Sequence, residues 1–329
     1  MFLPMNETRE TTTNTWHAGE REAQRRAGVA EKLATHGPRV LRPFMTEQHR
    51  QFFGQLPFLV VGSVDGQGRP SASLLSGYPG FAASPDPAIL LVSALPYAGD
   101  PLSQALKPGA ALGILGIEPP TRRRNRVNGR VAQVTADGFS LAVDQSFGNC
   151  PQYIHARDYL RWAGDGPASP CAVEALAKLD DEARELIARA DTLFLASAAA
   201  PDGPFSAVDV SHRGGLPGFL KLADDGAVEL PDYRGNFYFN SIGNLMTHPF
   251  IGLLIVDFDS RDLLQLAGNA EVIWDGQALA RHPGAQRLIR IGDASGRWLR
   301  RGFPLAMAAP ELSPQAIAAA VIDDRGGQD

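Results

Sequence analysis

The chain of 329 residues is long enough for about two domains of ordinary size, and 44% of its residues are hydrophobic, which is sufficient for a core. Its formal net charge of −5 gives no general attraction to nucleic acid or to an anionic membrane, so neither is an expected partner. Two cysteines, Cys150 and Cys171, are too few for a disulfide framework or a four-ligand zinc site, and no metal is expected. The sequence has no apolar signal segment and no apolar run of about 20 residues, which favours a cytoplasmic protein.

The first part of the chain changes from helical to strand-forming sequence. Residues 19–36 predict a helix that ends at Gly37 and Pro38, and Thr46 opens a second, short helix. Strand, tight turn and strand follow as PFLVVGSV, Asp65-Gly66 and RPSASLL. Further strands are predicted at 88–94, 110–117 and 124–134. This order lacks regular βαβ alternation, so it predicts a mainly β (α+β) fold with short helices.

A helix and then a second series of strands are predicted after residue 170. Apolar residues from Leu176 to Ala190 recur at helical spacing, so 170–190 predicts one amphipathic helix. The strands DTLFLAS and FSAVDVS flank a turn at Pro201-Asp202-Gly203. Residues 250–258 are continuously apolar, as in a strand buried on both faces. In the strand 263–274, alternation places Gln265 on one face with Asn269 and Glu271.

The second series repeats the first. YPGF at 78–81 corresponds to LPGF at 216–219, and a short helix follows a strand in both GDPLSQAL (99–106) and GNFYFNSIGNL (235–245). The hairpins at 118–129 and 257–268 correspond at a constant offset that matches Gly129 with Gly268. This shared order of elements predicts a duplication, although a single elongated β domain would also fit.

Three segments of the second half carry a resemblance to a known family. They are AVDVSHRGGLPGFL (207–220), PDYRGNFYFNSIGNL (231–245) and DLLQLAGNAE (262–271). With these segments, the second half resembles the pyridoxamine 5′-phosphate oxidase superfamily of FMN-binding split barrels, and the first half resembles a diverged copy. RRNRVNG (123–129) is similar to a stretch that the oxidases carry before a hairpin glycine. SFGNCPQYIH (146–155) is similar to a segment of family members without an assigned substrate.

The resemblance implies two tandem split β-barrels with short flanking helices, each barrel of six strands. The expected divisions are an N-terminal tail and helix (1–44), a diverged first barrel (45–145), a linker with the amphipathic helix (146–190), a second barrel with the flavin motifs (191–275) and a C-terminal extension (276–329). FMN is the implied cofactor. The oxidases hold its phosphate with an arginine and a lysine on the short helix, where this chain has Asn240 and Ser241. Oxidation of pyridoxamine phosphate is therefore not expected.

The chemistry of FMN selects the candidate binding residues. A phosphate dianion requires backbone N–H groups at a helix start, with hydroxyl, amide or guanidinium donors. Polar residues of these types gather around one predicted helix start and one strand end: Arg234, Asn236, Asn240, Ser241 and Asn244, with Ser211, His212 and Arg213. Gln265 completes this set. The alternatives are an ordinary helix cap for Asn240 and Ser241 and a solvated turn for 211–215.

The first half offers a basic strand to the same ligand. Arg122, Arg124 and Arg126 alternate along the hairpin and share one face. Since family members bind flavin between two barrels, Arg124 and Arg126 are candidate ligands from the first barrel, the alternative being a solvated hairpin face. Asp100 occupies the position of Asn236 in the other copy. A carboxylate there would repel a phosphate, so the site of the first barrel is expected to be degenerate.

Three functions fit this sequence. The first is an FMN-dependent oxidoreductase that acts on a small molecule, with NAD(P)H or a reductase as electron donor. The second is a haem-binding or haem-degrading split barrel, for which His212 is the histidine near the predicted site. The third is a flavin carrier without its own substrate. No catalytic residue can be named, and a homodimer or an internal pseudo-dimer is expected. The fold alone does not choose among these functions.

Overall fold

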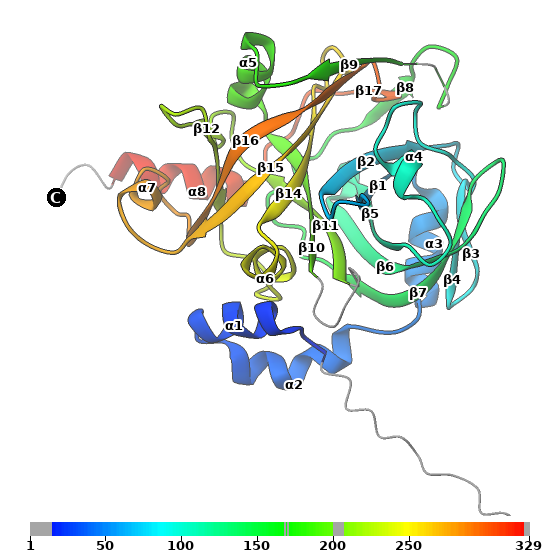
Figure 1. Ribbon diagram of the computed structural model, residues 1–329, viewed down its shortest axis with the longest axis horizontal. Helices are drawn as coiled ribbons and strands as arrows, with labels where there is room; N and C mark the ends of the chain where they lie inside the picture. Colours follow the sequence, from blue (N-terminus) through cyan, green and yellow to red (C-terminus); the bar gives the residue numbers. More distant parts are fainter. Residues whose placement is uncertain (1–14, 168, 170, 200–206, 326–329) are drawn as a thin grey trace, which may run out of the picture.

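The computed structural model describes residues 15–167, 169, 171–199 and 207–325. The N-terminal tail up to residue 14 and the expected turn at Pro201-Asp202-Gly203 lie outside the described residues. The described chain is mainly β with short helices, and it forms two antiparallel sheets in separate halves (Figure 1). The fold class expected from the sequence is therefore confirmed.

Seven strands form the sheet of the first half. Their order in the sheet is β2-β1-β5-β6-β7-β4-β3. The bounds are β1 (Phe58–Val64), β2 (Pro70–Ser76), β3 (Ala82–Asp86), β4 (Ile89–Val92), β5 (Ala111–Glu118), β6 (Arg123–Val134) and β7 (Phe139–Gly148).

The sheet of the second half has the same connectivity. Its order is β11-β10-β14-β15-β16-β13-β12, and β9 pairs with β16 as an additional strand. The bounds are β9 (Ala172–Leu176), β10 (Thr192–Ala199), β11 (Ala207–Gly214), β12 (Lys221–Leu222), β13 (Val228–Asp232), β14 (Phe250–Val256), β15 (Leu263–Ile273) and β16 (Arg287–Arg300). A separate two-stranded sheet joins β8 (Tyr159–Trp162) and β17 (Leu305–Met307).

Strand by strand, the two orders correspond, as the predicted duplication requires. Each path contains seven strands, so the expected six strands per barrel is wrong. The short strand β3 and the strand β7 were not foreseen in the first half. The second sheet also extends beyond residue 275, where the second barrel was expected to end, because β16 pairs with both β15 and β13.

Two of the expected helices differ from the observed ones. Residues 19–36 form parts of α1 (Ala18–Arg26) and α2 (Ala30–Val40), separated at Gly28, whose φ of 68° is left-handed. The stretch 170–190 divides into β9 and α5 (Asp181–Arg189), which begins after the capping side chain of Asp180. The other helices are α3 (Glu47–Gln55), α4 (Leu102–Ala105), the 3₁₀ turn η1 (Pro119–Thr121), α6 (Asn240–Thr247), α7 (Gln277–Ala280) and α8 (Pro314–Arg325).

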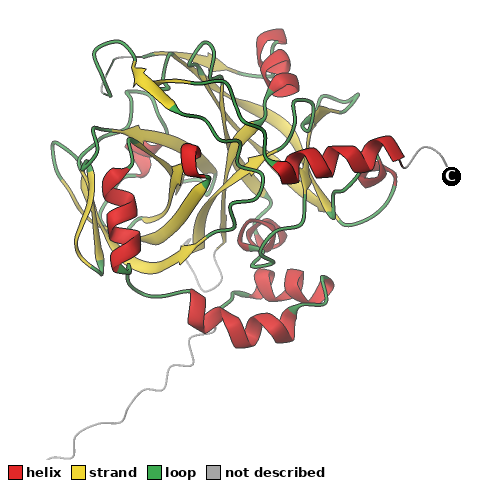
Figure 2. Ribbon diagram, turned by 180° about the vertical axis from the view of Figure 1, so that it is seen from behind, coloured by secondary structure: helices red, strands yellow, loops and turns green. Residues whose placement is uncertain are grey.

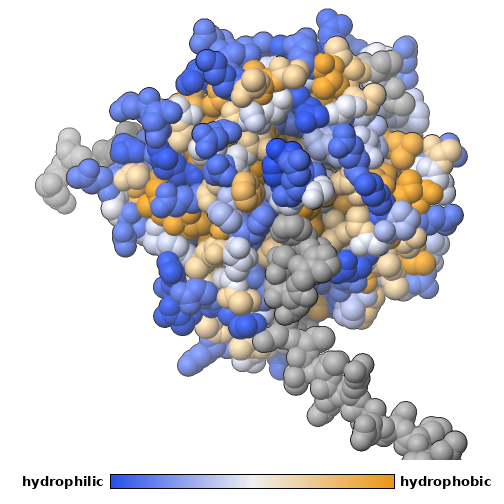
Figure 3. Space-filling model, in the orientation of Figure 1, coloured by the Kyte–Doolittle hydropathy of each residue, from blue (hydrophilic) through white to orange (hydrophobic). Residues whose placement is uncertain are grey.

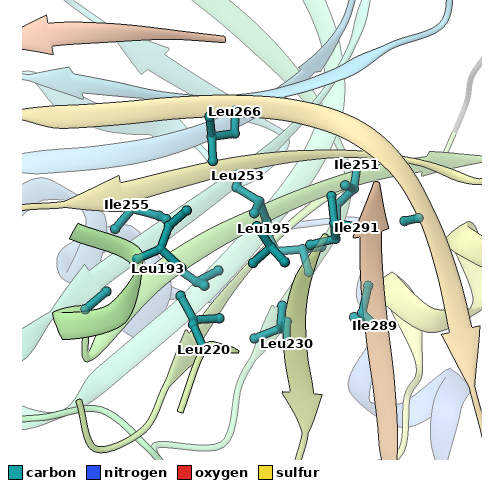
Figure 4. Close-up of a cluster of buried hydrophobic side chains, with 14 of the residues drawn as sticks. Leu193, Leu195, Leu220, Leu230, Ile251, Leu253, Ile255, Leu266, Ile289 and Ile291 are labelled. Atoms are coloured by element: carbon teal, nitrogen blue, oxygen red, sulfur yellow. The ribbon is translucent and has the colours of Figure 1, made fainter. Parts of the chain in front are cut away.

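The apolar side chains form one core in each half and a third between them. Leu193, Leu195, Leu253, Leu266 and Ile291 belong to the core of the second barrel (Figure 4). In the first barrel, α3 supplies the aromatic side chains of Phe52 and Phe53 to the core. Figure 2 shows the fold from behind, with the helices in red around the yellow strands. The third cluster draws on both halves and so joins them into an internal pseudo-dimer: Phe58, Val60, Leu115, Phe194, Leu254 and Val256 are among its members.

Two glycines in corresponding positions mark where the barrels touch backbone to backbone. A Cβ atom at Gly113 of β5 would lie 2.8 Å from the carbonyl oxygen of Val208 in the other barrel. A Cβ atom at Gly252 of β14 would lie 2.6 Å from the carbonyl oxygen of Pro70. Only glycine fits at such distances, so the same close approach occurs twice, once in each direction across the interface.

The N-terminal helices lie beside the barrels and not within them. In Figure 1, α1 and α2 lie below the sheets, with α1 against α6. Hydrophilic and hydrophobic residues are intermixed over the face shown in Figure 3. In the described part of the chain, no helix is long and apolar enough to cross a membrane.

Candidate functional site

A pocket opens where the first barrel meets the polar end of the second. Its empty volume, with the open mouth and the solvent there included, is about 820 Å³. Strand β6 contributes from the first barrel, while β11, the end of β13 and the start of α6 contribute from the second. Most of the residues expected from the sequence line it: Arg124, Arg126, Ser211, His212, Arg213, Asn236, Asn240 and Ser241.

Three of the expected residues lie elsewhere. Arg234 is not among the lining residues, and its guanidinium lies 5.8 Å from the ring centre of Phe237. Asn244 lies one turn into α6, where its side-chain amide donates to Ser197 Oγ at 3.1 Å. Gln265 is buried at the interface between the barrels, and it donates to the first barrel at Ala72 O over 3.0 Å.

Arg126 links the two barrels at the floor of the pocket. Its guanidinium forms an ion pair with Asp209 at 2.6 Å and donates to Ser211 Oγ at 2.8 Å. It also donates to Asn240 Oδ1 at 3.2 Å, and Ser211 Oγ lies 2.9 Å from Ser241 Oγ. Because the strand alternates, Arg124 and Arg126 reach the same side. The expected contribution of β6 to the site of the second barrel is thus present in the geometry.

Arg124 is a half-buried cation whose hydrogen bonds are to neutral groups. It donates to Cys150 O at 2.7 Å and to His212 O at 3.0 Å. No carboxylate pairs with it in the described chain. Burial, and next the neighbouring Arg126 and Arg213, lower the pKa of Arg124 to about 9. A partly buried charge without a counter-ion is costly, so this position favours an anionic ligand.

Two further arginines share one carboxylate at the opposite wall. Arg213 donates to Asp232 Oδ1 at 2.6 Å, and Arg287 donates to Asp232 Oδ2 at 2.8 Å. Four guanidinium groups of the pocket therefore face two carboxylates, those of Asp209 and Asp232. The pocket is electropositive, as a phosphate site requires.

Several buried nitrogen atoms around the pocket have no hydrogen-bond partner among the described residues. They are Arg126 Nε, Arg213 Nε, His212 Nδ1 and Asn149 Nδ2. Buried donors and acceptors normally have partners, and an exception is a common sign of a missing ligand. Their concentration in one pocket favours a polar ligand at this place.

His212 is held neutral. It is 4% exposed, and burial, followed by the charge of Arg124, places its pKa well below the usual value. A neutral imidazole can donate one hydrogen bond and accept another.

Aromatic residues and a strained loop form the outer wall of the pocket. Tyr153 and Tyr233 stack with ring centres 5.4 Å apart. Tyr153, Phe237 and Phe239 have φ values of 66°, 62° and 63°, which is the left-handed region. Bulky residues seldom adopt this conformation, and strain of this kind gathers at ligand sites. Tyr153, Asn149 and Arg287 were not identified as site residues from the sequence, although Asn149 and Tyr153 lie within the segment 146–155 that resembles family members.

The N-terminal helix α1 contacts the start of α6. Asn240 Nδ2 donates to Glu20 Oε1 at 2.6 Å, and His17 Nε2 lies 2.9 Å from Asn244 Oδ1. Burial raises the pKa of Glu20 to about 7. Asn240 thus touches both the pocket and a titratable carboxyl of α1. Nothing in the sequence of this helix indicated its position beside the site.

Comparisons with known proteins support the assignment of the second half. Residues 179–308 match the family model described as "Pyridoxamine 5'-phosphate oxidase". No curated protein matches the chain.

Solved structures offer only distant likenesses. HupZ of Group A Streptococcus is 15% identical with a TM-score of 0.28, over 39% of this chain and 98% of that chain. An F420 reductase is 14% identical with a TM-score of 0.24, over 36% of this chain and 98% of that chain. The Bacillus subtilis inhibitor of motility (MotI/DgrA) is 8% identical with a TM-score of 0.23, over 84% and 99%. Scores this low carry no functional argument. Over residues 179–308, less than half of its length, this chain is therefore similar to the pyridoxamine 5′-phosphate oxidase-like split-barrel family.

Proposed function

We propose that this protein binds FMN in the pocket between its two barrels and acts as a flavin-dependent oxidoreductase on a small molecule. The observation that carries the proposal is the half-buried guanidinium of Arg124, which has no carboxylate partner in the described chain and lies beside Arg126 and Arg213. A phosphate dianion would supply the missing negative charge. The family match favours a flavin as the ligand, and the electropositive pocket is where its phosphate would bind.

The residues present fit both ends of this cofactor. Arg124, Arg126 and the hydroxyl of Ser241 would hold the phosphate, together with N–H groups at the start of α6. The stacked pair Tyr153 and Tyr233 would face the flat ring system. When bound, FMN would supply the hydride or electron chemistry, whereas the protein orients it and excludes water. His212 would act as a neutral hydrogen-bonding group, since its surroundings oppose a positive charge.

The absorption spectrum and a binding titration test this proposal. The purified chain is expected to carry paired flavin bands in the blue and near ultraviolet, or to bind added FMN. NAD(P)H or a partner reductase is then expected to bleach those bands, and turnover with a small molecule would separate an enzyme from a carrier. A single intense Soret band would instead favour the haem alternative, with His212 as the candidate ligand. No spectral change with either cofactor would refute the proposal.

The oligomeric state remains a separate prediction. The two barrels already face each other within one chain, so the pocket draws on both without a second copy. A homodimer built from two chains is still expected, and light scattering at micromolar concentration tests it. A monomer mass would remove the homodimer without affecting the pocket.

A further inference from the structure

The duplication gives the pocket a counterpart at the related place in the molecule. Gln265 in β15 corresponds to Arg126 in β6, because each lies three residues before the matched glycines Gly268 and Gly129. Ser73 in β2 corresponds to Ser211 in β11. Ser73 pairs with Val61, which in turn pairs with Ile114 of β5. Ser211 reaches β14 through the equivalent pairs, from Leu195 to Leu253.

A carboxyl group of the chain itself fills this counterpart. Asp100 is 1% exposed. Its Oδ1 accepts from Ser73 Oγ at 2.5 Å and from the N–H of Leu102 at 2.8 Å. Its Oδ2 accepts from Gln265 Nε2 at 2.8 Å. Asp100 is therefore a carboxyl group surrounded by a hydroxyl, a backbone N–H and a side-chain donor of the opposite barrel. Burial raises its pKa, and these three hydrogen bonds oppose that rise.

The pocket of the second barrel has the same kinds of donor, but there a guanidinium pairs with the carboxylate beside them. Ser211 and Ser241 supply hydroxyls, and Arg126 reaches over from the opposite barrel, with its Nε unpartnered. Asp209 lies 2.6 Å from Arg126 and accepts from Ser211 Oγ at 3.3 Å. Arg124 and Arg213 add positive charge at this place, whereas the neutral Gln265 leaves the carboxyl group of Asp100 without an ion pair among the described residues.

We propose that the chain binds one anionic cofactor and not two, because the carboxyl group of Asp100 fills the second, related place and its hydrogen-bond donors. This inference rests on the proposed function, which assigns the anion at Arg126 to the phosphate of FMN. Asp100 and Gln265 then decide the stoichiometry, since the first supplies the competing carboxyl group and the second removes the cation that a phosphate needs.

Isothermal titration of the full chain with FMN tests the stoichiometry directly. One equivalent per chain is expected. Two equivalents would overturn this inference while leaving the proposed function intact. Zero equivalents would overturn the proposed function and the single site with it. The two failures are therefore distinguishable in one experiment.

A pair of variants tests the role of Asp100. In the double variant Asp100→Gly with Gln265→Arg, the carboxyl group is removed and a guanidinium is provided, so a second equivalent of FMN or of inorganic phosphate is expected. The matched control is Gln265→Arg alone, in which Asp100 is expected to pair with the new arginine and hold the count at one. A folded double variant that still binds one equivalent would overturn the role of Asp100. If that variant does not fold, the wild-type count still decides the inference.

Discussion

Arg124→Met is the sharpest perturbation of the proposed site. Methionine has a similar length and no charge, so it fills the space of the side chain. The substitution removes the hydrogen bonds that the guanidinium donates to Cys150 O and His212 O, at 2.7 and 3.0 Å. The substitution also removes a half-buried charge that has no carboxylate partner in the described part of the protein. These two losses act in opposite directions on the ligand-free protein.

The magnitudes separate binding from stability. Two carbonyl groups without partners cost about 1–3 kcal/mol each, whereas removing a charge that has no counter-ion relieves a desolvation penalty of roughly the same order. We therefore expect the free energy of unfolding of the ligand-free variant to change by no more than about 2 kcal/mol. A charge-assisted hydrogen bond to phosphate contributes about 1.5–3 kcal/mol. The dissociation constant for FMN is thus expected to rise roughly ten- to hundredfold.

Fluorescence titration with FMN and urea unfolding without it measure the two quantities. Arg130→Met is the matched control, because Arg130 lies on the same strand β6 but outside the pocket, with 44% of its side chain exposed. The control is expected to bind FMN like the wild type. If Arg124→Met binds FMN within threefold of the wild type, the phosphate is not held by this guanidinium and the proposed placement is wrong.

Three further outcomes are expected. The pKa of Glu20 is raised in the folded state to about 7 from 4.5, so its contribution to stability is complete below pH 4.5 and is lost as the pH rises through 7. Urea unfolding over this pH range should show a fall of about 3 kcal/mol in the free energy of unfolding of the wild type, and Glu20→Gln should remove that fall. The same pH dependence of stability in both proteins would contradict this expectation. Gly113→Ala and Gly252→Ala should each destabilise by roughly 1–3 kcal/mol in thermal unfolding, whereas Gly66→Ala, which meets no atom within 4 Å, should not; equal melting temperatures would refute the close contact. Ser241→Ala should weaken FMN by less than tenfold, since a neutral hydroxyl contributes only about 0.5–1.5 kcal/mol; a loss as large as that of Arg124→Met would reverse the proposed ranking.

Local sequence patterns were sufficient for most of the fold. Alternating or continuously apolar runs predicted β1, β2, β5, β6, β10, β14 and β15, since burial sets those patterns directly. The helix expected over 170–190 was partly wrong for a reason visible in the packing. Leu176 and Leu179 lie in the same core as the buried face of α5, so their helical spacing fits a core position without requiring a helix. Pairing of β9 with β16 depends on residues over 100 positions away, which no local pattern contains.

The site was predictable where it depends on one strand end or one helix start. Ser211 and Ser241 come together from two recognised motifs, and the alternation of β6 correctly placed Arg124 and Arg126 on one side. The sequence could not choose among the arginines, because the direction of a loop side chain depends on backbone angles. Arg234, one of the arginines expected at the phosphate, follows β13 and does not line the pocket. The contacts of α1 with the start of α6 could not be predicted either, because the sequence of a helix does not say against which other element it packs.

The fusion of the two barrels into one chain changes what mutation can achieve. In a symmetric dimer of identical subunits, every substitution is made twice, so a residue useful at one interface must also be tolerated at the other. Here Gly113 and Gly252 keep the close contact between the two barrels, while the sequences of the two halves differ. One half can then specialise in chemistry and the other in support. A dimer of identical chains could not have Arg126 in one barrel and Gln265 at the corresponding position of the other.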